Sequence, residues 1–202
     1  MNIRILIVSV WLAVITAGIS YLFWEQDWQY SLPTPVPKGY TEVKPGTQVR
    51  LPVTIAGSVD KPVFIHFYNP ECPCSKFNIP QFKSLVRLYS SQMAFAIVTL
   101  NAKKKYTTGE ILEQFGLESL PVFFLKSIAD VCGVYSTPQA VILKKDGRLY
   151  FRGNYNQSRY CLNRNTEYAK MAIDSLFGSS KEPDLPGGAF KSYGCSLPQC
   201  PN

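Results

Sequence analysis

Two cysteines separated by one residue, Cys72 and Cys74, lie a few residues after a strongly apolar segment. That segment, residues 62–68, is rich in β-forming residues and predicts a buried central strand. Apolar residues then recur at helical spacing over residues 74–90, which predicts a helix. The cysteines are therefore expected at the start of a helix, where backbone N–H groups and the helix dipole stabilise an anion. A thiolate is such an anion, and Cys72 is our candidate nucleophile.

Around these cysteines the sequence resembles thioredoxin-like proteins, and most closely the membrane-anchored thiol–disulfide oxidoreductases of the TlpA and redoxin type. The segments that carry the resemblance are residues 67–76 (FYNPECPCSK) with Pro80, residues 133–143 (GVYSTPQAVIL), Asp146-Gly147-Arg148 and Phe151-Arg152-Gly153. The resemblance covers roughly residues 49–177. It implies a thioredoxin-like three-layer α/β/α sandwich with a mixed central sheet, no cofactor, and protein thiols or disulfides or a membrane electron donor as partners.

The resemblance also assigns roles to residues of the second segment. It implies that Pro138 is a cis-proline facing the active site and that Thr137 offers its backbone to a substrate peptide. By the same resemblance, Pro80 kinks the active-site helix. Lys76, one turn into that helix, adds positive charge beside the cysteines.

The second cysteine departs from the usual Cys-x-x-Cys spacing of these proteins. Aligned without gaps, Cys72 matches the attacking cysteine and Ser75 takes the resolving position, so that Cys74 falls one residue early. Thiol exchange passes through a mixed disulfide that a second thiol must resolve. Three resolving groups remain open, namely Cys74, a distant cysteine or an external thiol. We rank Cys74 first.

A copper-binding assembly factor is the alternative from a different class of function. Paired thiolates select Cu(I) or Zn, and Cys72 and Cys74 offer two of them. Thioredoxin-like copper carriers of the Sco type use a Cys-x-x-x-Cys pair and a histidine from a later loop. His66, the one histidine of the chain, is predicted within a buried strand and is expected to be a core residue. A redox-silent scaffold that keeps only the fold is the third hypothesis.

Four further cysteines lie beyond this pair, and six cysteines allow 15 complete pairings. Cys161, Cys195 and Cys200 fall in a loop and a coil tail, and we expect a disulfide that attaches the tail to the domain. Cys132 lies six residues before Pro138. It is either a partner or resolver near the active face, or a small core residue.

The amino-terminal segment predicts the compartment. Residues 5–24 are almost entirely apolar, about the ~20 residues that a membrane-spanning helix needs. Arg4 precedes the segment and a cluster of bulky aromatic residues ends it, which favours an uncleaved anchor over a signal peptide. We expect a single-pass protein of the bacterial inner membrane whose soluble domain faces the periplasm, where disulfides are permitted.

Composition excludes several other classes. Of the 202 residues 46% are hydrophobic and 17% are charged, which is too apolar and too weakly charged for a disordered protein. The net charge of +7 is scattered along the chain, so we expect no nucleic-acid partner. We divide the chain into an anchor (1–24), a Pro-rich linker (25–48), a thioredoxin-like domain (49–178) and a Cys-containing tail (179–202).

The remaining elements complete the predicted domain. An edge strand is expected over residues 49–55, a second buried strand over 93–100, and a short helix over 109–115. Residues 140–143 and 149–151 flank an Asp-Gly turn and predict a hairpin. A final amphipathic helix is expected over residues 166–177.

Overall fold

The structure of the 202-residue chain is a computed structural model. It describes residues 3–28, 32–55, 58, 60–100, 105–157, 164–178 and 183–197. The chain divides into two compact units, Met1–Leu32 and Pro33–Asn202.

The first unit is an exposed apolar helix. Helix α1 spans Ile3–Phe23 and passes into a short π-helical turn, η1, over Trp24–Trp28. None of the α1 residues is buried, although their composition is strongly apolar. Among the residues that the structure describes, Ile3–Gln26 is the one helix long and apolar enough to cross a membrane. The predicted apolar helix at the amino end is therefore present.

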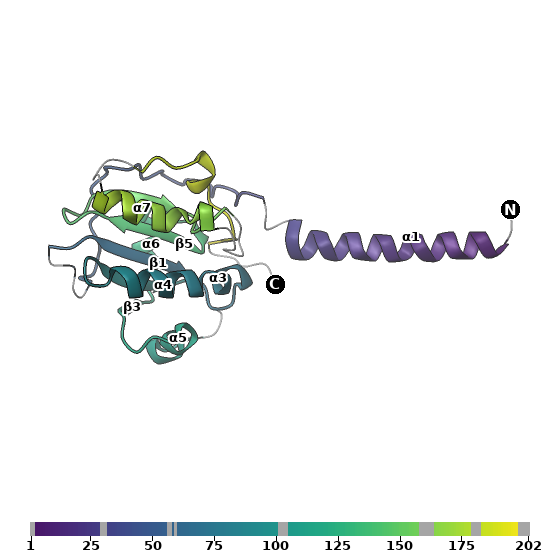
Figure 1. Ribbon diagram of the computed structural model, residues 1–202, viewed down its shortest axis with the longest axis horizontal. Helices are drawn as coiled ribbons and strands as arrows, with labels where there is room; N and C mark the ends of the chain where they lie inside the picture. Colours follow the sequence, from purple (N-terminus) through teal and green to yellow (C-terminus); the bar gives the residue numbers. More distant parts are fainter. Residues whose placement is uncertain are drawn as a thin grey trace. The chain divides into compact units, whose positions relative to one another are not determined.

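The second unit is built on a mixed sheet of five strands (Figure 1). The strand order is β3-β2-β1-β5-β6, with β1 in the centre. Strand β2 pairs parallel with β1, and β3 pairs parallel with β2. On the other side of β1, β5 pairs antiparallel with β1, and β6 pairs antiparallel with β5. The bounds are β1 Val63–Tyr68, β2 Ala94–Thr99, β3 Val122–Phe123, β5 Gln139–Leu143 and β6 Leu149–Gly153.

Helices cover both faces of this sheet. Their bounds are α3 Pro73–Phe77, α4 Ile79–Tyr89, α5 Thr108–Phe115, α6 Lys126–Cys132 and α7 Tyr168–Gly178, with a 3-10 turn η2 at Arg164–Thr166. Because side chains alternate along a strand, β1 sends Phe64 and Tyr68 into a core with α4, α5 and α7. The same strand sends Ile65 and Phe67 into a second core against α6. The result is the predicted thioredoxin-like three-layer α/β/α sandwich.

Three features differ from the sequence predictions. The helix expected over residues 74–90 is divided at Asn78 into α3 and α4, and Pro80 lies in the first turn of α4. The edge strand expected over residues 49–55 is absent from that described stretch, and only Gln48 forms an isolated bridge, to Arg148. Strand β3 was not predicted, since two residues are too short a run to show periodicity, and the seven-residue helix α6 was not predicted either.

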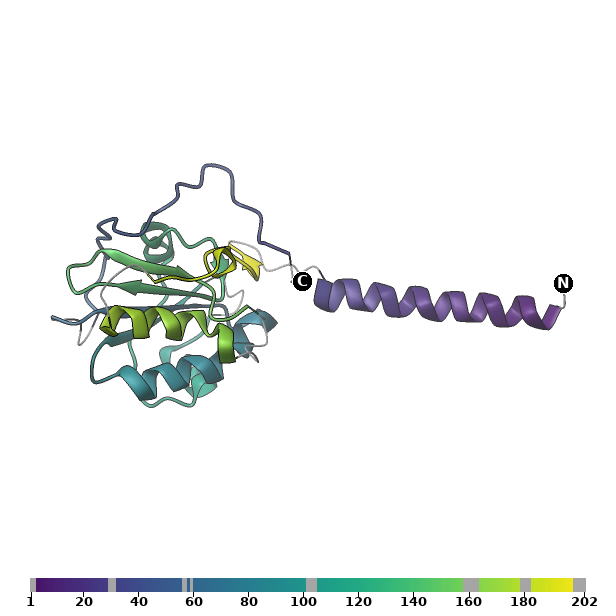
Figure 2. The same ribbon diagram turned by 45° about the horizontal axis from the view of Figure 1, so that its top comes forward.

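The tail after α7 folds back along the domain, where Figure 2 shows it in yellow beside the green strands. It forms a 3-10 turn, η3, over Gly187–Ala189 and a short strand, β7, over Cys195–Ser196. Strand β7 pairs antiparallel with β4, which spans Ser136–Thr137. The backbone N–H of Asn154 donates to the carbonyl of Ala189 at 2.9 Å, which attaches the start of the tail to the end of β6.

Candidate active site

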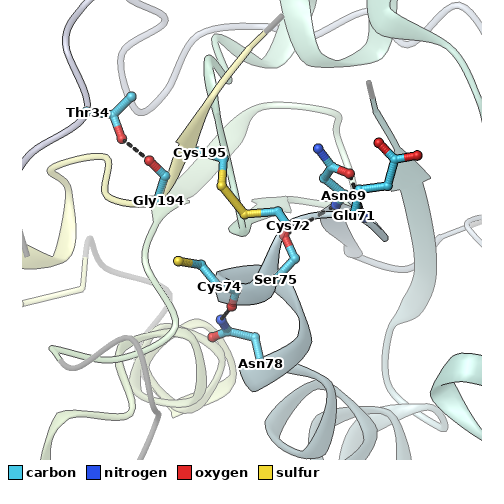
Figure 3. The surroundings of a disulfide bond; sticks show 9 residues. All are labelled: Thr34, Asn69, Glu71, Cys72, Cys74, Ser75, Asn78, Gly194 and Cys195. Carbon is cyan, nitrogen blue, oxygen red and sulfur yellow. Dashed lines mark hydrogen bonds between the residues drawn. A yellow bond between two sulfur atoms is a disulfide. The ribbon is translucent and has the colours of Figure 1, made fainter. Parts of the chain in front are cut away.

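Three sulfur atoms gather where β1 ends and α3 begins (Figure 3). Cys72 is disulfide-bonded to Cys195 of the tail, with 6.7 Å between their Cα atoms. Cys74 carries a thiol, and the sulfur atoms of all three residues lie within 4.8 Å of one another. Their exposed fractions are 0%, 2% and 4% for Cys72, Cys74 and Cys195. The cluster is therefore closed to solvent.

The loop before α3 positions Cys72 through Asn69. The N–H of Cys72 donates to the carbonyl of Asn69 at 3.1 Å, and the N–H of Glu71 donates to the side-chain Oδ1 of Asn69 at 2.9 Å. The hydroxyl of Ser75 accepts from the N–H of Asn69 at 3.3 Å. Pro73 then begins α3, a position where its missing N–H leaves no helical bond unmade. The hydrogen bonds of Asn69 thus stabilise the turn from which Cys72 leads into α3.

The two residues after Cys74 differ in their surroundings. Ser75, which the resemblance aligns with the resolving position, is fully buried and its hydroxyl supports the turn at Asn69. Lys76 is exposed to solvent. The amide of Asn78 donates to the carbonyl of Cys74 at 3.1 Å, which fixes the backbone where the helix breaks.

The loop before β5 contains the predicted cis-proline, since the Thr137–Pro138 peptide bond is cis. The backbone of Thr137 is paired, and its partner is the half-cystine of the tail. In the β4–β7 register Thr137 lies opposite Cys195 and Ser136 lies opposite Ser196. The N–H of Leu197 donates to the carbonyl of Tyr135 at 2.8 Å and extends the pairing.

The other edge of the tail pairs with the segment just after the first unit. The N–H of Thr34 donates to the carbonyl of Ser192 at 2.8 Å, and its hydroxyl donates to the carbonyl of Gly194 at 3.0 Å. Pro33 forms an isolated bridge with Tyr193. The tail therefore lies between Pro33–Thr34 and β4, so residues from within the predicted linker (25–48) contribute to the site.

The other predicted residues lie elsewhere or outside the description. Cys132 is fully buried at the end of α6 in the second core, where burial raises the pKa of its thiol to about 12. His66 is a core residue, as expected, and lies among aromatic rings with its Nδ1 at 2.6 Å from the hydroxyl of Tyr155. Cys161 and Cys200 fall outside the described residues.

The pairing of Cys72 with Cys195 was not predicted. The sequence indicated a disulfide that attaches the tail, and Cys195 does so, but its partner is the candidate nucleophile. No residue spacing favours one of the 15 pairings over another. The one local signal is Gly194, directly before the cysteine, whose significance depends on the fold.

The fold and the site together define a thioredoxin-like domain with its cysteine pair at the first turn after β1. The chain belongs to the family described as "Domain of unknown function (DUF6436)", which matches residues 42–195 and so includes both half-cystines. No curated protein matches the chain.

Solved structures are similar to this chain at low sequence identity. An uncharacterised conserved protein from Geobacillus kaustophilus is 18% identical with a TM-score of 0.60, over 80% of this chain and 95% of that one. A hypothetical protein from Sinorhizobium meliloti 1021 is 16% identical with a TM-score of 0.60, over 78% and 95%. The thioredoxin domain of a thiol-disulfide oxidoreductase from Bacteroides vulgatus is 10% identical with a TM-score of 0.49, over 59% and 94%.

Proposed function

We propose that this protein is a membrane-anchored thiol–disulfide oxidoreductase of the bacterial inner membrane whose domain faces the periplasm. Cys72 is the attacking nucleophile and Cys74 the resolving thiol. Protein disulfides, or the thiols of a membrane electron donor, are the partners, and no cofactor takes part. Thr137 and Pro138 form the peptide-binding loop.

One observation carries this proposal. Cys72 is bonded to a cysteine on an extended strand, and that strand pairs with the residue before the cis-proline. A mixed disulfide with a substrate needs the same three elements, namely a nucleophilic sulfur, a partner sulfur and a backbone edge to hold the partner chain. The tail supplies the partner side of that arrangement from within the chain.

The chemistry follows from the three sulfur atoms. The Cys72 thiolate attacks one sulfur of a substrate disulfide, that disulfide breaks, and the departing substrate thiolate takes up a proton. The Cys74 thiolate then attacks the Cys72 sulfur, forms a Cys72–Cys74 disulfide and releases the second substrate thiol. Two electrons pass from the cysteine pair to the substrate, and an external dithiol restores the pair.

Burial adds a requirement to this cycle. With Cys72 fully buried and Cys195 4% exposed, a second protein has no direct approach to the bond between them. The Cys72–Cys195 bond must open first, by attack of Cys74 on Cys72 with departure of the Cys195 thiolate. The external dithiol then reduces the resulting Cys72–Cys74 disulfide, and Cys72 is left as a thiolate that can attack a substrate. The 4.8 Å limit on the separations of the three sulfur atoms supports that exchange.

The test is reduction of insulin disulfides with dithiothreitol as the electron source. We expect Cys72→Ser to lower the rate to that of dithiothreitol alone, since the attacking sulfur is gone. Cys132→Ala is the matched control, because that thiol lies in the second core, and it is expected to keep the parent rate. Catalysis that persists in Cys72→Ser contradicts the proposal. Loss of catalysis in Cys72→Ser but not in Cys74→Ser shows that a thiol other than Cys74 resolves the mixed disulfide.

Copper binding is a second candidate function, and the third sulfur favours it. Once the disulfide is reduced, Cys72, Cys74 and Cys195 place three soft donors in one buried cluster, a donor set that suits Cu(I). We expect the reduced chain to bind one Cu(I) in an anaerobic titration against a chromophoric chelator. A Cys72→Ser/Cys74→Ser double variant is expected to lose that site. Unchanged binding in the double variant rejects it.

A further inference from the structure

The residue before the tail cysteine lies against the cis-proline loop. Gly194 has φ +114°, a conformation that residues with a side chain rarely adopt. A Cβ atom at this position would overlap the carbonyl oxygen of Thr137 and lie 3.0 Å from its carbonyl carbon. It would also lie 3.2 Å from Cδ of Pro138. Only glycine fits between the strand and the loop.

The atoms that would clash with a Cβ at position 194 belong to the peptide-binding loop, Thr137–Pro138, and not to the tail. The nearest atoms to the missing Cβ are backbone atoms of Thr137 and a ring atom of Pro138, which cannot turn aside as a flexible side chain does. Any polypeptide that brings a cysteine to Cys72 by pairing with Thr137 in this register places its preceding residue in the same space. The restriction therefore applies to an external chain as it does to the tail.

The residues after the cysteine add a second preference. Leu197, two positions beyond Cys195, is 8% exposed and belongs to the second core. Ser196, between them, is half-buried and lies opposite Ser136. An extended strand sends alternate residues to the same side, so the position two after the cysteine favours an apolar residue.

We propose that the substrates of this site are extended polypeptides in which glycine directly precedes the reacting cysteine and an apolar residue lies two positions after it. The segment Tyr193–Leu197 of the chain itself is a tethered example of such a substrate. This inference rests on the proposed function, because it concerns the partner of Cys72.

The experiment uses the full chain with Cys195→Ser and Gly194→Ala. The first change removes the tail sulfur that bonds Cys72, and the second is intended to displace the tail from the loop. The protein is reduced and the reductant is removed before the assay, so that Cys72 and Cys74 are both thiols. The probes are the peptides Ser-Tyr-Gly-Cys-Ser-Leu and Ser-Tyr-Ala-Cys-Ser-Leu, each carrying thionitrobenzoate on its cysteine as a disulfide. The Cys72 thiolate attacks the peptide sulfur, the peptide becomes bonded to Cys72, and thionitrobenzoate leaves as a coloured thiolate. The same variant with Cys72→Ser supplies the background from other thiols.

We expect the glycine peptide to react with Cys72 at least about tenfold faster than the alanine peptide, which corresponds to about 1.4 kcal/mol. The single amino acid cysteine carrying thionitrobenzoate has no strand that can pair with Thr137. Its rate of reaction with Cys72 is therefore expected not to depend on the peptide-binding loop. In the variant with Cys195→Ser alone the tail competes, so both peptides are expected to react more slowly with their ratio preserved.

Two failures are distinguishable. Equal rates for the two peptides, with a clear signal that depends on Cys72, overturn the glycine preference and leave the proposed function standing. A signal that does not change when Cys72 is replaced contradicts the proposed function itself. Faster reaction of the alanine peptide also overturns the inference.

Discussion

His66 illustrates how a titratable side chain becomes part of an apolar core. Its ring stacks on Phe82 with 4.7 Å between centroids, and Nδ1 bonds the hydroxyl of Tyr155. Burial lowers the pKa of His66 to about 3, because the charged form would lose its hydration. The side chain is therefore neutral in the folded protein at every pH near neutrality, and it lies in the core that α4, α5 and α7 share.

The lowered pKa predicts a pH dependence of stability. The unfolded chain takes up a proton on this residue below about pH 6.5, whereas the folded chain does so only near pH 3. Stability contributed by neutral His66 is thus complete above pH 6.5 and is lost as the pH falls toward 3. Between pH 6 and pH 4 we expect the free energy of unfolding of the parent protein to fall by about 2–3 kcal/mol more than that of His66→Gln. Urea unfolding at each pH measures both values.

Tyr155→Phe is the control for this measurement. It removes the hydroxyl beside Nδ1 but leaves the histidine buried, so the steep loss of stability with falling pH is expected to remain. Parallel pH profiles for the parent and His66→Gln would show that burial of this ring does not govern the acid sensitivity.

In the short helix α3, Ser75 has a structural role at the position that the resemblance assigns to the resolving cysteine. The hydroxyl of Ser75 accepts a hydrogen bond from the N–H of Asn69, a bond that holds the end of β1 against the helix. A serine at this position supports the turn, and the second thiol comes from Cys74, one residue nearer to Cys72. The break at Asn78 then separates α3 from α4, which begins at Ile79.

Strand β7 gives a prediction at the scale of an element. Gly194→Ala introduces a Cβ against backbone atoms of Thr137 and should weaken the pairing of β4 with β7. Opening of the tail exposes the Cys72–Cys195 bond, so we expect glutathione to reduce it at least about tenfold faster, which corresponds to 1.4 kcal/mol or more in the opening equilibrium. Alkylation of quenched samples followed by mass spectrometry measures the rate.

Gly187→Ala is the matched change in the same tail. A Cβ atom at Gly187 meets no atom within 4 Å, and the residue precedes the paired strand. We expect the parent rate of reduction in this variant. Equal acceleration by both substitutions would point to general loosening of the tail in place of the specific contact at Thr137.

The whole molecule could be predicted from its sequence where the patterns were long and local. The buried strands β1 and β2 and the hairpin of β5 and β6 were predicted within one or two residues, because continuous apolar runs and an Asp-Gly turn specify them. The cis-proline followed from the resemblance, the position of Cys72 at the start of a helix followed from the apolar pattern around it, and both are present.

The parts that escaped prediction depend on contacts between distant segments. Strands β4 and β7 contain two residues each, too few for an alternating pattern, and their register is set by the tertiary fold. Thr34 was assigned to a linker because of the prolines around it, yet its hydrogen bonds go to Ser192 and Gly194. The disulfide depends on the same folding back of the tail.

The sequence separation of 123 between Cys72 and Cys195 also sets an order of events in synthesis. At about 5–20 residues per second, the ribosome adds Cys195 roughly 6–25 s after Cys72. During that interval Cys72 has Cys74 in its neighbourhood and no tail to bond. A nascent chain that is oxidised early therefore acquires other pairings first, and the bond between residues 72 and 195 is reached by later exchange of those pairings.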